Sequence, residues 1–336
     1  MGKSSGKQQL KRRHHTVPQL LLRRFAEGES LVRVPLDGKA PHPCGIKNVT
    51  VHRDFYSMVD EAGQLDDTVE NMLSDLEGQA AEVLRQVLDD GVWPLPIDER
   101  AVLAEWIAAQ HARIPAARTA HNEMADQLGK IAIAMGGKPE IRRHLEETAT
   151  EPVSDEEVEA LWAEVTDFDN YYAEMSVNDH MASMGQSIKT AYDVFMRRAW
   201  GLIRFQRRAL LIPDHPVTLV REETLPSFYG VGIANAAAVL VPIDRRAAIM
   251  MASPGPDFVV RTHTKLALEL NQRFAWNARR ELFHHPDDNP LEGVELPSVR
   301  DREMQVSQRP ENFLLPDGPS DAFKRVMTNL PEPPAS

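Results

Sequence analysis

The chain has 336 residues, of which 42% are hydrophobic and 26% are charged, and its formal net charge is −12. This length allows one large domain or two smaller ones, and the composition is that of a soluble globular protein. No stretch stays apolar over the roughly 18 residues that a membrane-spanning helix needs, so we expect no membrane insertion. The single cysteine, Cys44, excludes an internal disulfide and a multi-cysteine zinc site and favours a reducing, cytoplasmic location.

The charge is unevenly distributed along the chain. Residues 1–25 contain seven lysines and arginines and no acid, which leaves 31 basic and 50 acidic residues, a charge of −19, on the rest. An acidic body repels nucleic acid at long range, whereas a basic arm could contact phosphate locally. We expect residues 1–10 to form a flexible basic arm, although a solvated tail that merely leads into the fold explains the same charges.

Residues 11–200 are predicted to be mainly helical. The strongest helix covers residues 66–90, where apolar residues keep helical spacing and Gly91 follows as a stop signal. A second long helix begins near Asp98, and Pro115 should kink or restart it, because proline has no backbone N–H to donate. The remaining expected elements are a helix at 18–25, a strand at 31–34, a loop through 41–43, a break at 136–137, a helix after Ser154 and a helix over 181–198.

The sequence pattern changes near Trp200. Short apolar runs separated by prolines predict a β-meander, and a closing helix is expected over residues 263–283. Residues 286–336 hold nine of the 24 prolines and should form a poorly ordered tail. The predicted fold is α+β and predominantly helical, with long packed helices, a C-terminal β-meander and a closing helix. Residues 11–285 would form a single composite domain with a helical part over 11–200 and the meander and final helix over 201–285.

Two polar residues occupy the apolar side of the second long helix. At 100° per residue, Leu103 falls about 20° from Gln110 and Arg113 falls about 60° from it, within the stripe formed by Trp106 and Ile107. A buried arginine and a buried amide need partners, because an unpaired polar group in the core is strongly unfavourable. The pattern therefore predicts either a core arginine–carboxylate pair that fixes packing or an arginine that faces an internal anion-binding pocket.

The first long helix offers matching carboxylates. Glu70 and Glu77 are seven residues apart, which places them within about 20° of each other on one helix face. Both lie at the edge of the apolar stripe. They could pair with Arg113, bind a metal or act in acid–base chemistry, or they could be ordinary surface glutamates.

Two further segments carry polar residues next to prolines. His14 and His15 are adjacent, so in an extended chain they point in opposite directions and at most one is expected to face a site. Asp214, followed by His215 and Pro216, lies at a predicted strand end, which is a common place for a functional residue and also for an ordinary turn.

The combination of these motifs resembles a bacterial domain-of-unknown-function family, number 4238. The resemblance covers about residues 11–285 and includes the opening His14–Phe25 motif, the Phe55-Tyr56 pair, Glu70 with Glu77, the Gln110–Pro115 motif, the segment 212–217, and Asn271 with Arg279. At residues 213 and 215 proline and histidine stand where the family motif has serine and asparagine. The resemblance implies a mainly helical fold with a β region and implies no established activity.

The sequence contains no phosphate loop, nucleophile elbow or H-E-x-x-H motif. We expect a polar pocket, and the first hypothesis is a hydrolase, with or without a divalent metal, that acts on a phosphate-bearing or nucleic-acid substrate. The ligands or acid–base groups would be His14, His15, Glu70, Glu77 and Asp214, and the anion-binding or orienting groups would be Arg23, Gln110, Arg113 and Asn271. The alternative is a non-catalytic module that binds a ligand or partner, in which the same residues form a structural polar network.

Overall fold

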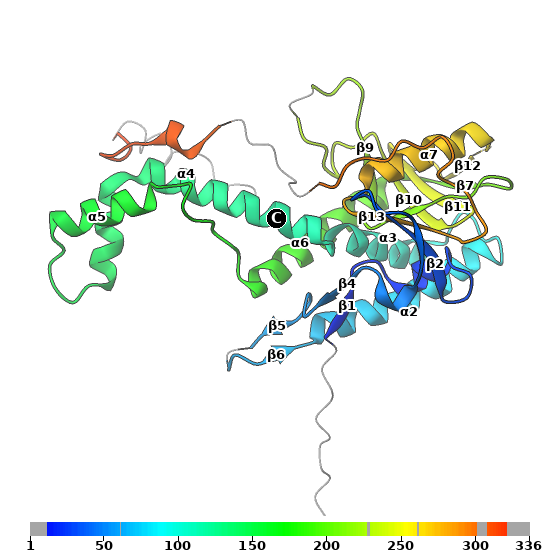
Figure 1. Ribbon diagram of the computed structural model, residues 1–336, viewed down its shortest axis with the longest axis horizontal. Coiled ribbons are helices and arrows are strands. Elements are labelled where there is room, and N and C mark those ends of the chain that lie inside the picture. The colour runs from blue at the N-terminus through cyan, green and yellow to red at the C-terminus, as the bar shows by residue number, and fades with distance from the viewer. Residues whose placement is uncertain (1–11, 61, 227–228, 261, 301–307, 321–336) are drawn as a thin grey trace, which may run out of the picture. The chain divides into compact units, whose positions relative to one another are not determined.

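The computed structural model describes residues 12–60, 62–226, 229–260, 262–300 and 308–320 (Figure 1). The chain forms two compact units, and we describe each by itself. Unit 1 comprises residues 1–118 and 176–301, and unit 2 comprises residues 119–175 and 302–336. The predicted basic arm at residues 1–10, and residues 301–307 and 321–336 of the predicted tail, lie outside the described residues.

Three long helices form one layer of unit 1. These are α2 (Thr68–Leu88), α3 (Ile97–Ala112) and α6 (Val177–Arg197), and α3 packs against both of the others. The apolar stripe of α2 is buried as its spacing predicts, whereas α3 is buried on most of its circumference because small alanines let its neighbours approach closely. The predicted helices at residues 66–90 and from Asp98 are thus confirmed, and they pack together.

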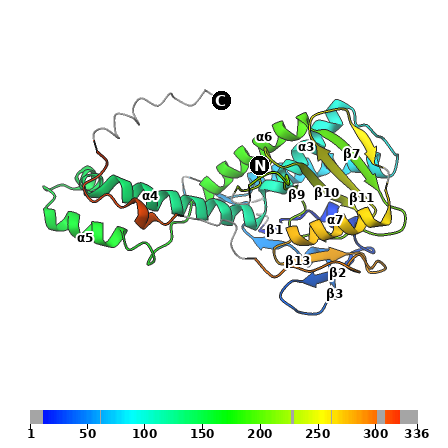
Figure 2. The ribbon, with the colours of Figure 1, turned by 90° about the horizontal axis from the view of Figure 1, so that it is seen from above.

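A five-stranded sheet forms the next layer. It contains β7 (Ala199–Arg204), β9 (Thr218–Val220), β10 (Ala238–Asp244), β11 (Ala247–Ala252) and β12 (Phe258–Val260) in the order β12-β7-β11-β10-β9. Strands β9, β10 and β11 are consecutive and antiparallel, as in a meander, but β12 lies parallel to β7 at the edge. In Figures 1 and 2, β10 and β11 lie between α3 and α7 (Thr264–Asn277).

A second sheet joins distant parts of the chain. Its strands are β2 (Ser30–Pro35), β3 (His42–Gly45), β8 (Ile212–Pro213) and β13 (Glu281–His284), in the order β3-β2-β13-β8. Unit 1 also contains two small antiparallel strand pairs, namely β1 (Arg13–His15) with β4 (Val51–Arg53) and β5 (Met58–Val59) with β6 (Leu65–Asp66). Short helices lie at α1 (Gln19–Arg23) and η1 (Ile46–Asn48).

The prediction of a predominantly helical fold is wrong. Helices make up 43% and strands 18%, with seven α-helices and four sheets among the described residues, so the fold is mixed α+β. The closing helix ends at Asn277, and Leu282 and Phe283 lie instead in β13, opposite Val34 and Arg33 of β2. The expected loop at residues 41–43 overlaps β3. Short apolar runs fit either a helix or a strand, and only the pairing partner decides between them.

Unit 2 is built on most of α4 (Pro115–Thr148), together with α5 (Asp155–Val165) and η2 (Pro310–Phe313). The helical course of α4 is interrupted at Gly137, which has φ of 66°, a conformation that favours glycine. Ser154 caps α5 in a reciprocal capping box with Glu157, as predicted. None of the described helices has the length and apolar character to cross a bilayer.

Candidate functional site

The opening motif belongs to a strand in unit 1. Strand β1 pairs with β4 so that His14 lies opposite His52 and His15 opposite Val51. Because successive side chains of a strand point to opposite faces, His14 is fully buried and His15 is only half-buried. The two histidines therefore have different environments, as predicted for an extended segment.

His14 is held by Tyr56. Its Nδ1 accepts a hydrogen bond of 2.7 Å from the backbone N–H of Tyr56, and the two rings stack with centroids 5.2 Å apart. The Tyr56 hydroxyl in turn donates to the backbone carbonyl of Arg113 at 2.7 Å. Burial raises the pKa of Tyr56 far above its usual value, and the charges of Glu70 and Glu77 add to the effect, so the phenol stays protonated. Tyr56 thus ties the opening motif to the end of α3.

Arg113 is the centre of the polar contacts. Its Nη1 donates to Glu77 Oε1 at 2.7 Å, and its Nη2 donates to Gln110 Oε1 at 3.0 Å. Gln110 also donates from Nε2 to the carbonyl of Trp106 at 3.2 Å. The Arg113 side chain is 1% exposed and that of Glu77 is 26% exposed. The predicted burial of Gln110 and Arg113, and the predicted pairing with a glutamate of the first long helix, are confirmed.

His15 lies at the half-buried edge of the same region. Its Nδ1 is 3.2 Å from the carbonyl oxygen of Val49, and its Nε2 is 3.0 Å from the amide nitrogen of Gln19. A neutral ring with its proton on Nδ1 satisfies both contacts, since Nδ1 then donates and Nε2 accepts. Burial lowers the pKa of His15 most, the bond to Val49 opposes this, and the positive charges of nearby arginines lower it further.

The charges of three arginines act on His15. The guanidinium groups of Arg13, Arg113 and Arg23 are each close enough to lower the pKa of its ring. Arg23 donates to Glu29 Oε1 at 3.0 Å and to Gln19 Oε1 at 3.2 Å, so Gln19 connects it to His15. We call this region the Arg113 cluster; its members are Arg13, His14, His15, Gln19, Arg23, Tyr56, Glu77, Gln110 and Arg113, with the charge of Glu70 acting on Tyr56.

Asp214 directly follows β8 and accepts hydrogen bonds from three backbone N–H groups. Its Oδ1 accepts from the backbone N–H of Arg279 at 2.9 Å, and its Oδ2 accepts from those of Arg280 and Glu281 at 2.8 and 3.3 Å. Burial raises the pKa of this carboxyl, and the three backbone hydrogen bonds oppose the rise. The carboxylate therefore fixes the turn between α7 and β13.

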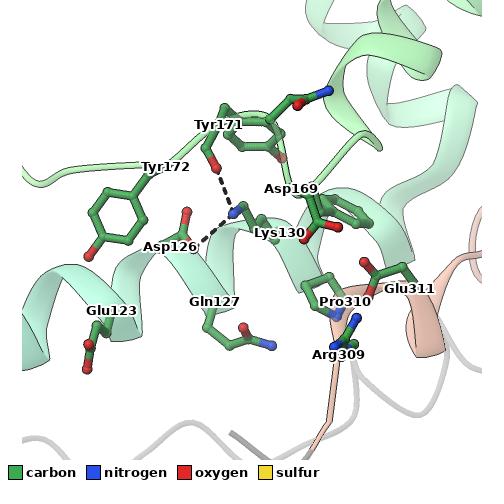
Figure 3. A pocket seen from close by; sticks show the side chains of 12 residues that line it. Glu123, Asp126, Gln127, Lys130, Asp169, Tyr171, Tyr172, Arg309, Pro310 and Glu311 are labelled. Carbon is green, nitrogen blue, oxygen red and sulfur yellow. Dashed lines mark hydrogen bonds and ion pairs between the residues drawn. The ribbon is translucent and has the colours of Figure 1, made fainter. Parts of the chain in front are cut away.

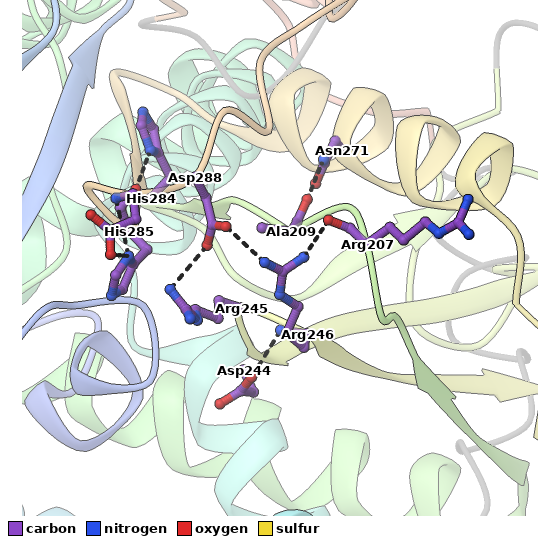
Figure 4. Close-up of polar contacts among 10 residues, drawn as sticks. Arg207, Ala209, Asp244, Arg245, Arg246, Asn271, His284, His285 and Asp288 are labelled. Atoms are coloured by element: carbon purple, nitrogen blue, oxygen red, sulfur yellow. Dashed lines mark hydrogen bonds and ion pairs between the residues drawn. The ribbon is translucent and has the colours of Figure 1, made fainter.

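Asn271 also serves the fold. Its Oδ1 accepts from the backbone N–H of Leu211 at 3.0 Å, and its Nδ2 donates to the carbonyl of Pro290 at 3.2 Å. The Nδ2 also donates to the carbonyl of Ala209 at 2.9 Å (Figure 4). The side chain is fully buried and bonds three backbone groups, so it holds a loop to α7. Figure 4 also shows Asp288 accepting from Arg245 and Arg246 nearby.

Sequence reasoning missed several polar residues near these positions. Gln19 follows His15 by four residues and begins α1, so this spacing was the available signal. The rings of half-buried His111 and buried His215 have centroids 6.3 Å apart, and neither ring nitrogen of His215 has a hydrogen-bond partner among the described residues. Burial lowers the pKa of both rings, that of His111 to about 4. A pairing between residues 111 and 215 has no signal in the sequence.

The predicted metal ligands are distributed over different contacts. His14 Nδ1 accepts a hydrogen bond from Tyr56, Glu77 accepts one from Arg113, and Asp214 accepts from backbone N–H groups. Within the described residues, no group of three histidine, cysteine, aspartate or glutamate side chains has an arrangement that could hold a metal ion. What the Arg113 cluster offers is a set of guanidinium, amide and neutral imidazole groups, which is chemistry for binding an anion.

Comparison with known proteins gives a family and nothing more specific. No curated protein and no solved structure matches the chain. The model of a family described as "Protein of unknown function (DUF4238)" matches residues 13–288, which include every residue of the Arg113 cluster. This span is most of the chain, and it agrees with the resemblance seen in the motifs. The chain belongs to the DUF4238 family of proteins of unknown function.

Proposed function

We propose that unit 1 is a binding module for a small phosphate-bearing ligand, with the Arg113 cluster as its site. The observation that carries this proposal is that Gln19 joins Arg23 to His15, while Arg13 and Arg113 lie near enough to lower the pKa of the His15 ring. Guanidinium groups match the geometry of phosphate oxygens and present several donors at once. Three guanidinium groups in one region, two of them paired with Glu29 and Glu77, support an anionic ligand that exchanges for a carboxylate, even though the whole chain is acidic.

Arg23 and Arg113 would have different roles. Arg23 is 49% exposed and its partner Glu29 is 53% exposed, so this surface ion pair contributes little and can exchange for a ligand phosphate. Arg113 is buried and held by Glu77 and Gln110, so it would contribute a fixed positive potential rather than a movable contact. His15, neutral near pH 7, would accept or donate a hydrogen bond without adding charge.

Hydrolysis at the same place is the second candidate function. His15 favours it, because a half-buried imidazole with a lowered pKa is neutral at physiological pH and can accept a proton from water. In this version Arg23 and Arg113 would stabilise the negative charge that develops on the phosphoryl group. The metal-assisted form, and nucleic acid as the phosphate carrier, stay predictions.

Titration of the full chain with inorganic phosphate and with adenosine monophosphate, followed by calorimetry or NMR, tests the binding proposal. We expect Arg23→Gln to weaken binding about tenfold, since a charge-assisted hydrogen bond is lost, while the thermal midpoint hardly changes. Arg273→Gln is the matched control, because Arg273 is an exposed arginine of α7 outside the cluster. Equal affinities of wild type and Arg23→Gln would refute the site.

The same samples separate binding from catalysis. Phosphate release from adenosine monophosphate that is abolished in His15→Asn but retained in Arg273→Gln would establish hydrolysis. Binding that depends on Arg23 without any phosphate release would leave the non-catalytic module. Short duplex and single-stranded DNA added as competitors would show whether a nucleic-acid phosphate occupies the site.

A further inference from the structure

Unit 2 contains a cavity of about 720 Å³ that is separate from the Arg113 cluster (Figure 3). Its walls come from α4, from residues 168–172 after α5, and from residues 309–311 at η2. This volume lies within the range of roughly 300 to 1,000 Å³ that small-molecule sites occupy. The cavity is therefore large enough for a metabolite-sized ligand.

Lys130 lies in one wall of the cavity, and its ammonium group already has partners there. Lys130 is nearly buried, its Nζ lies 3.0 Å from Asp126 Oδ2, and it donates to the carbonyl of Tyr171 at 2.9 Å. Its ammonium also lies 4.8 Å from the centroid of the Tyr171 ring. Asp126 Oδ1 accepts from the backbone N–H of Ala173 at 2.8 Å. Lys130 is thus committed to the wall and is not available to bind an anion.

The remaining charges of the cavity are mainly acidic. Glu123, Asp169 and Glu311 line it, and Arg309 is the other basic residue among its lining residues. Asp169 and Glu311 make no side-chain hydrogen bond or ion pair with another described residue, and Figure 3 shows their carboxylates on the same side of the cavity. Both acids are exposed, and neither forms an ion pair with Arg309 or Lys130, so together they leave a negative potential that a ligand could neutralise.

Tyr172 contributes an aromatic ring on the side of the cavity away from Asp169 and Glu311 (Figure 3). Tyr172 is 51% exposed, and in Figure 3 its ring lies beside Glu123 and Asp126. Burial raises the pKa of its phenol first, and the carboxylates of Asp126, Glu123 and Glu174 raise it further. An exposed aromatic face surrounded by negative charge attracts organic cations, because their charge interacts with the ring while their carbon atoms pack on it.

We propose that this cavity binds a small organic cation that carries ammonium or guanidinium groups on a short apolar stem. Asp169 and Glu311 would receive one charged end, and the ring of Tyr172 would pack against the stem near Glu123. Anions are disfavoured because the lining acids outnumber the basic residues and Lys130 is already paired. A site of this kind is independent of phosphate binding at the Arg113 cluster.

Titration of the full chain with agmatine and with putrescine, followed by calorimetry or NMR, tests the proposal. We expect saturable binding that weakens as the salt concentration rises, because salt screens the charge interactions. 1,4-Butanediol, which has the length of putrescine without its charges, should not bind. Binding of the diol equal to that of putrescine, or no saturable binding of either cation, would overturn the proposal.

Four variants locate the site. Asp169→Asn and Glu311→Gln should each weaken binding about tenfold, since each removes a charged acceptor. Tyr172→Ala should weaken binding, whereas Tyr172→Phe should preserve it because the ring face rather than the hydroxyl makes the contact.

Glu156→Gln is the matched control, since it removes an exposed charge of α5 outside the cavity lining. An equal loss of affinity in this control would show general attraction to an acidic protein and would refute a specific site. Unchanged affinity in both Asp169→Asn and Glu311→Gln would refute it as well. Thermal unfolding of each variant verifies that the fold is retained.

Discussion

Half-buried His111, whose Nδ1 is enclosed, should make the protein sensitive to mild acid. His111 Nδ1 is inaccessible to solvent and has no hydrogen-bond partner among the described residues, and burial lowers the pKa of the ring from 6.5 to about 4. In the unfolded chain the same ring binds a proton near pH 6.5. The unfolded state therefore takes up more protons than the folded state as the pH falls from about 6.5 to 4, and stability is lost over this interval.

The size of the effect follows from the two pKa values. Each pH unit between them corresponds to about 1.36 kcal/mol, and integration from pH 7 to pH 5 gives a loss of roughly 2 kcal/mol from His111 alone. Part of the residue reaches solvent, so this value is an upper bound. His215 should contribute in the same direction, because burial lowers its pKa as well.

Urea unfolding of the wild type and of His111→Gln at pH 7 and pH 5 measures the contribution. The substitution has its own effect on packing, but that effect is the same at both pH values and cancels in the comparison. We expect the wild type to lose up to about 2 kcal/mol more than His111→Gln between the two pH values. A parallel loss of stability in the two proteins would show that His111 is not buried in its neutral form.

Two further substitutions test the Arg113 cluster as a structural unit. Glu77→Gln should reduce the free energy of unfolding, measured with urea, by about 2 kcal/mol; a fully buried pair would cost about 3 to 5 kcal/mol, but the Glu77 side chain is 26% exposed. The double variant with Arg113→Met should regain part of this loss. If the losses of the two single variants simply add in the double variant, the pairing is contradicted. Tyr56→Phe should cost about 1 kcal/mol in the same assay, since it leaves the buried carbonyl of Arg113 without its donor, and an unchanged urea midpoint would show that another group satisfies that carbonyl.

Helical periodicity was sufficient to place the centre of the candidate site. Gln110 lies on the buried face of α3 and Arg113 is its C-cap residue one turn further on, as expected because 3.6 residues per turn determines which side chains share a face. The same periodicity predicted Glu77 at the edge of the apolar stripe of α2, and in the structure Glu77 pairs with Arg113. The surplus of acid over base and the single cysteine likewise follow from the sequence without any structure.

The tertiary structure decided the parts that depend on partners distant in sequence. Leu282 and Phe283 form a strand because β2, some 250 residues earlier, offers unpaired backbone groups beside them. The burial of His14 depends on the pairing of β1 with β4 and on the contact between Tyr56 and the His14 ring. Asp214 is fixed by the backbone N–H groups of residues 279–281.

The physical reason for this division is the range of each interaction. A helix satisfies its own backbone hydrogen bonds within four residues, so its existence and its buried face are written in local sequence. A strand leaves its backbone groups open until another strand arrives, and a buried carboxylate or imidazole takes its role from whichever donor the fold brings to it. The sequence therefore determined the helices and the burial of Arg113, while only the tertiary structure determined that Tyr56 joins His14 to Arg113 and that Gln19 joins Arg23 to His15.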